Sequence, residues 1–352
     1  IEKDSVAWRF QTGATELSFS GHIHETLEVW DKNGVRKPKL SADDSSFLTH
    51  SSIIIAKDYI IEQSIQSEIV IINEAHHLPY HRTFTRSLLA DLFENGYRYL
   101  GLEALFDSTI NERKFATLSS GYYTKEPEFG NLIHEALTLG FTLFSYEASV
   151  GKNGKEREIE QADNIQQFIS NNPNGKVLIH CGYAHAYEHE YPSWGKAMAG
   201  RLKDNMKIDP FTIEQTVFLE KSNPENNHRF IQQNNLSVPF LLLHENGSFY
   251  TGKNTDIVVI HPKTTYSDGR PYYLIKHREK YIVPNEKLPK NSSSLILAYR
   301  ENEYEKEGIP TDIIEVTETK NSAALFLPKG KYTIIIKDAN YNILERYNIE
   351  IE

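Results

Sequence analysis

The stretch from residue 68 to residue 105 constrains the fold most, because strand and helix patterns follow one another in it without interruption. Ile69-Val70-Ile71-Ile72 is a short, β-branched run without polar residues, which is typical of a strand buried on both faces. Apolar residues then recur at helical spacing over residues 80–95, and residues 97–102 form a second apolar run. The stretch therefore predicts a strand, a helix and a second strand of an α/β sheet.

The same alternation of patterns continues to about residue 279. Further strands are predicted at residues 141–146 and 176–180, with weaker candidates at 212–219 and 256–260, and helices at 47–66, 131–139, 157–170 and 194–202. We expect an α/β domain over residues 51–279, with a mixed, mostly parallel sheet flanked by helices. After residue 280 the pattern changes to short alternating segments separated by turn residues, which predicts a small β-sandwich over residues 280–352. Residues 1–50 alternate only weakly and predict an irregular segment of short strands or extended pieces that packs on the main domain.

Composition argues against several classes of function. The net charge of −10 argues against a nucleic-acid partner, and no apolar run approaches the roughly 20 residues that span a bilayer. Cys181 is the single cysteine, which excludes an internal disulfide and a cysteine-based zinc site. Because the chain begins at Ile1 rather than Met, we expect that an upstream segment such as an export signal has been removed or left out, and hence a periplasmic or cell-surface protein. No feature of the sequence points to a particular oligomeric state.

Ionisable side chains follow each of four successive predicted strands. They are Glu74, His76 and His77 after the first strand, Glu103 after the second, Glu147 after the third, and His180 with His185 at the fourth. A lone glutamate or histidine at a strand end is usually structural, but four strand ends in succession favour a functional site. Because parallel strands end at one edge of a sheet, where ligands bind, we expect these groups to converge in one cleft.

Carboxylates beside imidazoles support two chemistries. A glutamate can orient a histidine, or act as a base on water while a histidine protonates the leaving group. Alternatively, two histidines and one or two glutamates can hold a divalent metal that acidifies water; the candidate ligands are Glu74, His76, Glu103 and His185. Neither a serine-nucleophile elbow nor a phosphate-binding glycine loop occurs in the sequence.

Two further patterns allow both a functional and a structural interpretation. The segment His185-Ala186-Tyr187-Glu188-His189 fits a short zinc-binding pattern, His-x-x-Glu-His, that requires a helix. It follows a predicted strand and a glycine turn, which argues against that helix. Arg157 either clamps an anionic group near the loop of Glu147 or pairs with its neighbours Glu158 and Glu160.

Taken in order over residues 65–220, these motifs resemble the superfamily of erythromycin esterase-like, ChaN-like and TIKI/TraB-type proteins. The matching segments are Asn73-Glu74-Ala75-His76-His77, with asparagine in place of the usual glycine, Leu78-Pro79-Tyr80-His81, Gly101-Leu102-Glu103, Arg157-Glu158-x-x-x-Ala162-Asp163-Asn164 and His180-x-Gly182-x-x-His185. Asparagine tolerates left-handed backbone geometry, so we expect the turn after the first strand to be retained. The resemblance implies three functions: the esterase-like branch hydrolyses a lactone with Glu and His without an obligatory metal, the TIKI branch is similar to a metal-dependent protease, and ChaN-like members bind haem.

We therefore predict a hydrolase of an ester, lactone or peptide bond, with a small molecule or peptide as substrate. The predicted catalytic residues are Glu74, as the base or water-orienting group, with His76, His77, Glu103 and His185. The predicted substrate-binding residues are Arg157, Glu147, His180 and His81. The alternative is a haem or metal carrier without hydrolytic activity that uses His76, His77 and His81. A third possibility is an enzyme fold that has lost activity and works through its β domain.

Overall fold

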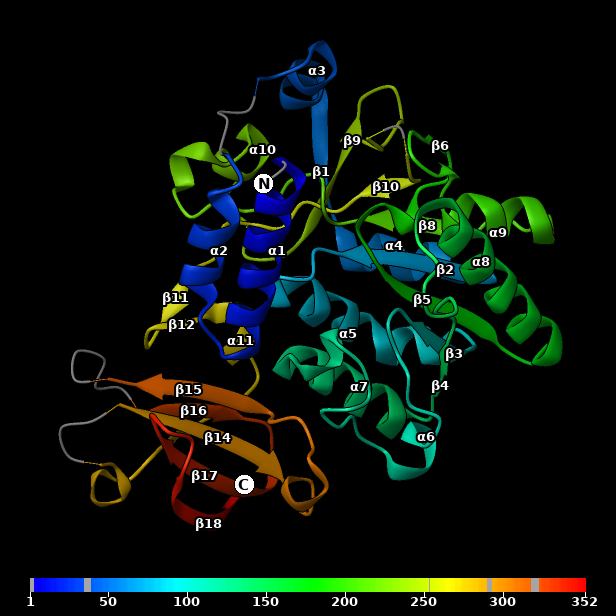
Figure 1. Ribbon diagram of the computed structural model, residues 1–352. Helices are drawn as coiled ribbons and strands as arrows, with labels where there is room; N and C mark the ends of the chain where they lie inside the picture. The colour runs from blue at the N-terminus through cyan, green and yellow to red at the C-terminus, as the bar shows by residue number, and fades with distance from the viewer. Residues whose placement is uncertain (1–2, 35–38, 253, 290–292, 318–322) are drawn as a thin grey trace.

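The computed structural model describes residues 3–34, 39–252, 254–289, 293–317 and 323–352. Figure 1 shows a helix-flanked sheet in the first part of the chain and a separate antiparallel β region near the C-terminus. The main sheet has the strand order β10-β8-β2-β5-β3-β4, and every pair of neighbours is parallel. The predicted fold class is therefore confirmed. Its strands are β2 (Ile69–Glu74), β3 (Tyr97–Leu102), β4 (Thr142–Ser145), β5 (Lys176–Gly182), β8 (Phe211–Glu214) and β10 (Ile257–Val258).

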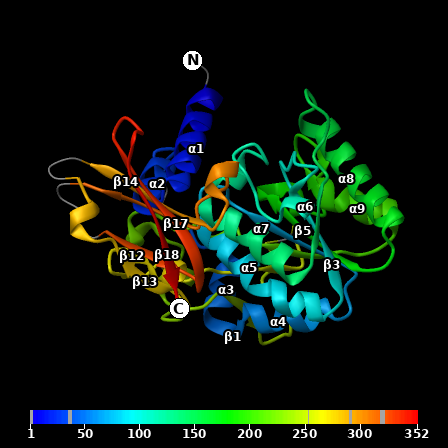
Figure 2. The same cartoon turned by 90° about the horizontal axis from the view of Figure 1, so that it is seen from below.

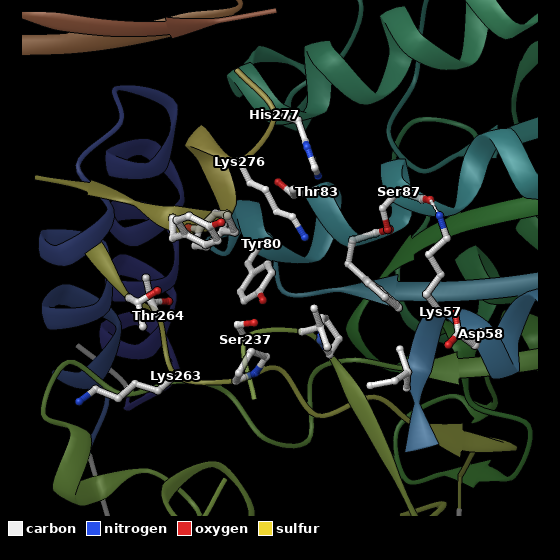
Figure 3. A pocket seen from close by; sticks show the side chains of 18 residues that line it. Lys57, Asp58, Tyr80, Thr83, Ser87, Ser237, Lys263, Thr264, Lys276 and His277 are labelled. Atoms are coloured by element: carbon white, nitrogen blue, oxygen red, sulfur yellow. Dashed lines mark hydrogen bonds between the residues drawn. The ribbon is translucent and has the colours of Figure 1, made fainter. Parts of the chain in front are cut away.

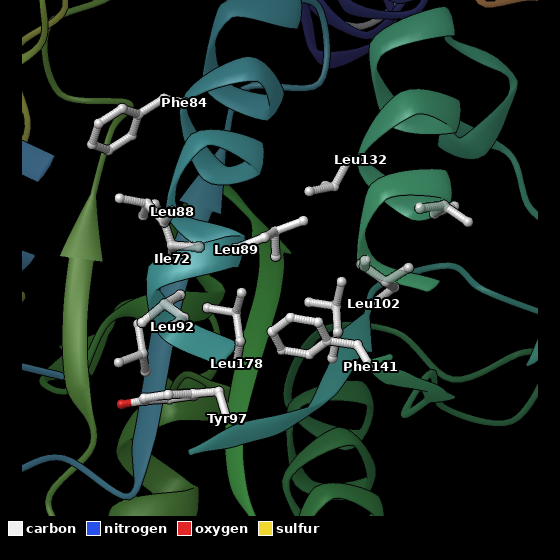
Figure 4. Close-up of a cluster of buried hydrophobic side chains, with 14 of the residues drawn as sticks. Ile72, Phe84, Leu88, Leu89, Leu92, Tyr97, Leu102, Leu132, Phe141 and Leu178 are labelled. Atoms are coloured by element: carbon white, nitrogen blue, oxygen red, sulfur yellow. The ribbon is translucent and has the colours of Figure 1, made fainter. Parts of the chain in front are cut away.

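Both faces of this sheet are covered by helices, as the uninterrupted apolar run of β2 predicts. Val70 and Ile72 pack on one side, and Ile69 and Ile71 on the other, because successive side chains of a strand alternate between faces. The first side is covered by α4 (Ala56–Ser64), α5 (Pro79–Glu94) and α7 (Pro127–Leu139), and the second by α8 (Gly154–Asn171) and α9 (Met198–Met206). Figure 4 shows the leucines of α5 meeting Ile72 in the first layer.

The prediction of an irregular segment over residues 1–50 is wrong. The chain instead forms α1 (Lys3–Phe19), α2 (Ile23–Asp31) and α3 (Ala42–His50). Apolar periodicity did not reveal α1 and α2 because small and polar side chains are buried between them, among them Ala14, Ser18 and Thr26. The hydroxyl of Thr26 donates to the Ala14 carbonyl across this hairpin, so a polar residue occupies a core position.

The predicted helix over residues 47–66 is interrupted by a strand. Residues 51–55 form β1 (Ser51–Ile55), which pairs antiparallel with β9 (Phe240–His244). Ile53, Ile54 and Ile55 are β-branched and suit a strand better than a helix. The predicted strands at 212–219 and 256–260 exist as the shorter β8 and β10.

The C-terminal region has two antiparallel sheets with an apolar core between them. One sheet contains β15 (Asp312–Val316), β14 (Ser294–Arg300), β17 (Gly330–Asp338) and β18 (Ile343–Ile351), and the other pairs β13 (Glu279–Ile282) with β16 (Ala324–Leu327). Leu325, Ile334 and Ile336 are buried in that core. This region lies beside α7, where Arg300 donates to Asn131 at 2.8 Å (Figure 2). The boundaries of the predicted domains stay a prediction.

The remaining elements are short and lie in the connections. They are α6 (Ile110–Arg113), α10 (Arg229–Gln232), α11 (Tyr272–Ile275), β6 (Glu190–Tyr191), β7 (Gly195–Lys196), β11 (Tyr266–Ser267), β12 (Arg270–Pro271), and the 3-10 turns η1 (Tyr123–Lys125), η2 (Tyr183–Ala186), η3 (Pro224–Asn226), η4 (Asn285–Lys287) and η5 (Tyr304–Lys306). No helix within the described ranges combines the length and the apolar character needed to cross a bilayer.

Candidate active site

The predicted acids and imidazoles meet at the carboxyl edge of the main sheet. Parallel register places Glu74 of β2 beside Gly182 of β5, and Leu102 of β3 beside His180 of β5. Glu103, which follows β3, therefore lies next to the end of β5, and its backbone N–H donates to the His180 carbonyl. The strand ends bring the side chains into two adjoining clusters, one around Glu74 and one around Glu103.

Glu74 is the centre of the first cluster and is almost completely buried, with 1% of its surface exposed. Its Oε1 accepts from His76 Nδ1 at 2.8 Å and from Arg82 Nη2 at 2.6 Å. Its Oε2 accepts from Arg82 Nε at 2.6 Å and lies 2.9 Å from His180 Nε2. Arg82 also donates to Glu126 at 3.0 Å. Both oxygens of Glu74 are thus fully engaged by cationic or imidazole donors.

The ionisation of Glu74 follows from these partners. Burial disfavours the charged carboxylate, but Arg82 and His180 outweigh burial and hold the pKa of Glu74 well below its usual range. Arg82, which sequence analysis missed, lies in the first turns of α5 and has no exposed surface. An arginine among polar neighbours in an amphipathic helix is expected to lie on the surface. The burial of Arg82 is explained only by the position of Glu74 in the structure.

His76 has one ring nitrogen held and one free of hydrogen bonds to the described residues. Nδ1 binds Glu74, and the ring stacks on Tyr123, with 3.6 Å between ring centroids and 14° between planes. Because the partner of Nδ1 is a carboxylate, Nδ1 is the protonated nitrogen of the neutral ring and Nε2 is left with a lone pair. This arrangement is the one required of a general base.

The second cluster joins Glu103 to Arg157, Glu147 and His185. Arg157 donates from Nη2 to Glu103 and to Glu147, at 2.7 Å each, and from Nε to Glu147 at 2.8 Å. Its Nη1 lies 2.9 Å from His185 Nε2. The two structural partners expected for Arg157 in the sequence, Glu158 and Glu160, are not its partners here. Arg157 instead links the loops that follow β3 and β4 to η2.

Electrostatics keeps this second cluster charged. Burial opposes ionisation of Glu103, but His185 and Arg157 lower its pKa to about 2. For His185, burial favours the neutral ring, but Glu103 and Glu158 outweigh it and raise the pKa. Glu158 lies 2.8 Å from His185 Nδ1, and the ring stacks on Trp194. Trp194 is a further member that the sequence did not single out, and Glu158, which the sequence suggested as a partner of Arg157, contacts His185 instead.

Gly182 is the point at which the two clusters meet. Its backbone N–H donates to Glu103 Oε2, and a Cβ at this position would lie 2.5 Å from His76 Nε2 and 3.0 Å from Glu103 Oε2. Only glycine leaves room for the His76 ring beside Glu103. The next residue, Tyr183, has φ 42°, and Ala104, which follows Glu103, has φ 53°. Left-handed backbone at non-glycine residues is costly and is concentrated at functional sites.

Asn73 has a different role from the one we expected. It lies within β2 and does not adopt the left-handed geometry that the family's glycine suggested. Its Nδ2 donates to Glu214 at 2.8 Å and to the Tyr183 carbonyl at 2.7 Å, and its Oδ1 accepts from the Gln215 backbone at 2.7 Å. Asn73 therefore ties β2 to β8 and to the strained turn of η2.

Replacing Asn73 with alanine is expected to lower the free energy of unfolding by about 2–4 kcal/mol, because three buried partners lose their hydrogen bonds. Urea unfolding followed by circular dichroism measures this loss. The same change at Asn246, an exposed residue that accepts from Ser248, is expected to cost less than about 1 kcal/mol. Equal losses at the two positions would contradict the role assigned to Asn73.

Three predicted histidines lie deeper than the site chemistry requires. His77 is completely buried, with its ring stacked on Trp30 of α2 at 3.8 Å. His81 is 2% exposed and accepts from the Ala75 N–H, and His180 is 1% exposed behind Glu74. A substrate would reach these rings only after rearrangement, so the catalytic role of His77 and the substrate-binding roles of His81 and His180 stay predictions.

The candidate metal ligands do not fit a divalent cation in this arrangement. Glu74 is held by Arg82 and Glu103 by Arg157, so a cation would have to displace two guanidinium groups from buried ion pairs. In the ranges that the structure describes, no group of three or more His, Cys, Asp or Glu side chains is arranged to hold a metal ion. The zinc pattern that begins at His185 lacks its helix, because the turn η2 ends at Ala186.

A haem does not fit the described histidines either. An axial ligand needs an exposed ring nitrogen beside an open face, whereas His77 lies under Trp30 and His81 packs against His261. The remaining candidate, His76, has one ring face stacked on Tyr123, and its Nε2 lies close to the Gly182 backbone and Glu103, so a porphyrin at Nε2 would meet the chain there. The histidines that the carrier interpretation requires are thus each packed against an aromatic or imidazole ring.

Comparisons with known proteins do not assign this chain to a family. No protein-family model matches the sequence, and no curated protein matches it. Among solved structures, the type III effector HopBA1 is similar over 58% of this chain and 93% of its own, with 10% identity and a TM-score of 0.39. The toxin effector domain RRSP of Vibrio vulnificus is similar over 76% of this chain and 49% of its own, with 14% identity and a TM-score of 0.34. ChaN of Campylobacter jejuni, which binds heme cofacially, is similar over 60% of this chain and 96% of its own, with 11% identity and a TM-score of 0.37. At these identities and scores the likenesses do not identify a family for this chain.

Proposed function

We propose that this protein is a hydrolase of an ester, lactone or peptide bond, with His76 as its general base. The observation that carries the proposal is the pairing of His76 Nδ1 with Glu74 at 2.8 Å, which leaves Nε2 free beside Glu103 and Gly182. A carboxylate that holds a histidine in this way fixes its tautomer and stabilises the imidazolium that forms during catalysis.

The proposed reaction begins when His76 Nε2 takes a proton from a water molecule. The water oxygen forms a bond to the carbonyl carbon of the substrate, and the electron pair of the carbonyl moves to its oxygen. The positive charge of Arg157, whose side chain is 24% exposed, stabilises that oxygen. The intermediate then collapses, the bond to the leaving group breaks, and the imidazolium of His76 returns its proton to the leaving group.

Glu74 acts through His76 in this proposal and does not contact water. Its two oxygens are already occupied by Arg82, His76 and His180, and its low pKa makes it a weak base. The sequence suggested that Glu74 is either a base or a group that orients water. The contacts support an orienting role, but the group that Glu74 orients is His76 rather than water. Glu103 and His185 hold Arg157 in place.

A substrate screen tests the proposal. The purified protein is incubated with chromogenic esters, with lactones monitored by ring opening, and with a mixture of peptides analysed by mass spectrometry. Turnover by the wild type that is lost in the His76→Gln variant supports a hydrolase. Turnover that is equal in the two proteins arises elsewhere and contradicts the assignment.

Hydrolysis is expected to survive removal of metal ions, because Arg82 and Arg157 already neutralise the two carboxylates. Rates measured before and after exhaustive dialysis against a chelator should agree within about twofold. A loss of more than about tenfold that added zinc or manganese restores would show that a metal takes part and that the ion pairs described above open to admit it.

The alternative of a haem carrier has a direct test of its own. Titration of the protein with haemin is expected to produce no saturable Soret shift, because neighbouring rings or the chain itself block the approach to His76, His77 and His81. A saturable shift that disappears in the His77→Ala variant would favour the carrier over the hydrolase.

A further inference from the structure

A pocket separate from the active site lies between α4, α5 and α11. Its volume is about 300 Å³, and the loops at residues 237–239 and 262–265 complete its wall. None of the residues of the two active-site clusters lines it. Helix α5 borders both features, with Tyr80 and Thr83 on the pocket side and Arg82 on the side of Glu74.

The pocket contains polar groups that have no partner among the described residues. Figure 3 shows Tyr80, Lys276 and His277 turned toward the middle of the pocket. Neither the Tyr80 hydroxyl nor the Lys276 ammonium has a hydrogen bond or ion pair within the described ranges, whereas Lys57 is neutralised by Asp91 at 2.7 Å and donates to the Ser87 carbonyl at 2.9 Å. A cation and a hydroxyl that face one cavity without partners suit an anionic ligand.

The charges of the residues that line the pocket also favour an anionic ligand. Three lysines and one aspartate, Asp58, line the pocket. Lys57 is already paired with Asp91, and Lys263 points away from the pocket in Figure 3. Lys276 is therefore the lysine left to meet an anion inside it.

The rest of the wall is apolar and aromatic. Tyr80 stacks on Tyr273, with 4.2 Å between ring centroids and 3° between planes, and Ile55, Phe84 and Pro239 supply aliphatic and aromatic surface. A flat ring fits against such a surface and buries apolar area. The volume is at the lower end of the range of about 300–1,000 Å³ that small-molecule sites occupy, so it suits a ligand of one or two rings.

We propose that this pocket binds a small amphipathic carboxylate, such as an aromatic acid. Its carboxylate accepts from the Lys276 ammonium and the Tyr80 hydroxyl, and its ring lies against the apolar wall. The site needs no hydrolytic activity, so the inference is independent of the proposed function.

Isothermal titration calorimetry with 3-phenylpropionate tests this inference. The acid is expected to bind saturably, and 3-phenylpropanol, which has the same ring and chain without the charge, is expected to bind at least about tenfold more weakly, because a charge-assisted hydrogen bond is lost. Changing Lys276 to glutamine should lower the affinity for the acid by about tenfold and leave the affinity for the alcohol unchanged. Tyr80→Phe should lower the affinity for the acid by several-fold.

Lys263→Gln is the matched control, because it removes the same charge from a lysine of the lining that points away from the cavity. Its affinity for the acid should equal that of the wild type. Thermal melting confirms that each variant is folded, and Lys276 is exposed, so its replacement disturbs no core contact. The inference is wrong if the acid does not bind at concentrations up to about 10 mM, if 3-phenylpropylamine binds as well as the acid, or if Lys276→Gln and Lys263→Gln have equal effects.

Discussion

Replacing His76 with glutamine is expected to lower kcat/KM for hydrolysis by about 10²–10⁴-fold, which is the contribution of a positioned general base. Glutamine keeps an amide that can donate to Glu74 and fill the space under Tyr123, so the fold should be retained. It has no nitrogen lone pair with which to accept a proton from water. The loss should therefore appear in kcat rather than as unfolding, and a melting curve run beside the kinetic assay separates the two.

Two further variants give this prediction its controls. Glu74→Gln should also reduce hydrolysis strongly, because an amide group facing Nδ1 no longer favours the tautomer with a free Nε2. His24→Gln changes a histidine whose side chain is 58% exposed and should leave the rate unchanged. If His76→Gln retains more than about a tenth of the wild-type rate, another group is the base.

Replacing Arg82 with methionine is expected to lower the free energy of unfolding by about 3–5 kcal/mol. Arg82 has no exposed surface, neutralises Glu74 and donates to Glu126, whose pKa is raised to about 7 by burial. Methionine fills most of its volume but leaves the buried Glu74 carboxylate without its cation and Glu126 without its donor, and breaking a buried pair in this way is strongly destabilising. Because proteins of this kind are stable by only about 5–15 kcal/mol, the loss is a large fraction of the total.

The comparison for Arg82 is the same substitution at the surface. Arg346 pairs with Glu305, and its side chain is 48% exposed, so Arg346→Met should cost less than about 1 kcal/mol. Arg82→Lys should be intermediate, because lysine restores one charge but not the two-pronged contact with Glu74. Urea unfolding curves measure all three variants. Equal losses for Arg82→Met and Arg346→Met would mean that the buried network does not hold the site together.

The convergence of the site could be predicted from the sequence because the sheet is parallel. Apolar runs in the sequence indicate strands such as β2, β3 and β5. Because these strands are parallel, the residues at or just after their ends, Glu74, Glu103 and His185, lie at one edge of the sheet. Their partners His76, His180 and Arg157 were among the predicted site residues, but other partners could not be predicted. Arg82 and Tyr123 come from elements whose local pattern says nothing about which strand end they face.

The N-terminal helices show a second limit of sequence patterns. Their interface buries small and polar side chains such as Ser18 and Thr26, so it lacks the apolar periodicity that reveals α5. The start of α3 did carry a signal, since Ser41 and Asp44 form a capping box. Trp30, which covers His77, could be recognised as part of the site surroundings only once α2 was placed in space.

The tautomer of His76, measured by long-range proton–nitrogen NMR on protein with labelled histidine, tests the role of this residue most directly. If His76 is the general base, its neutral ring carries the proton on Nδ1, where Glu74 accepts it at 2.8 Å, and Nε2 is unprotonated. Resonances that show the proton on Nε2 instead would mean that Glu74 does not orient the ring and that His76 is not the base.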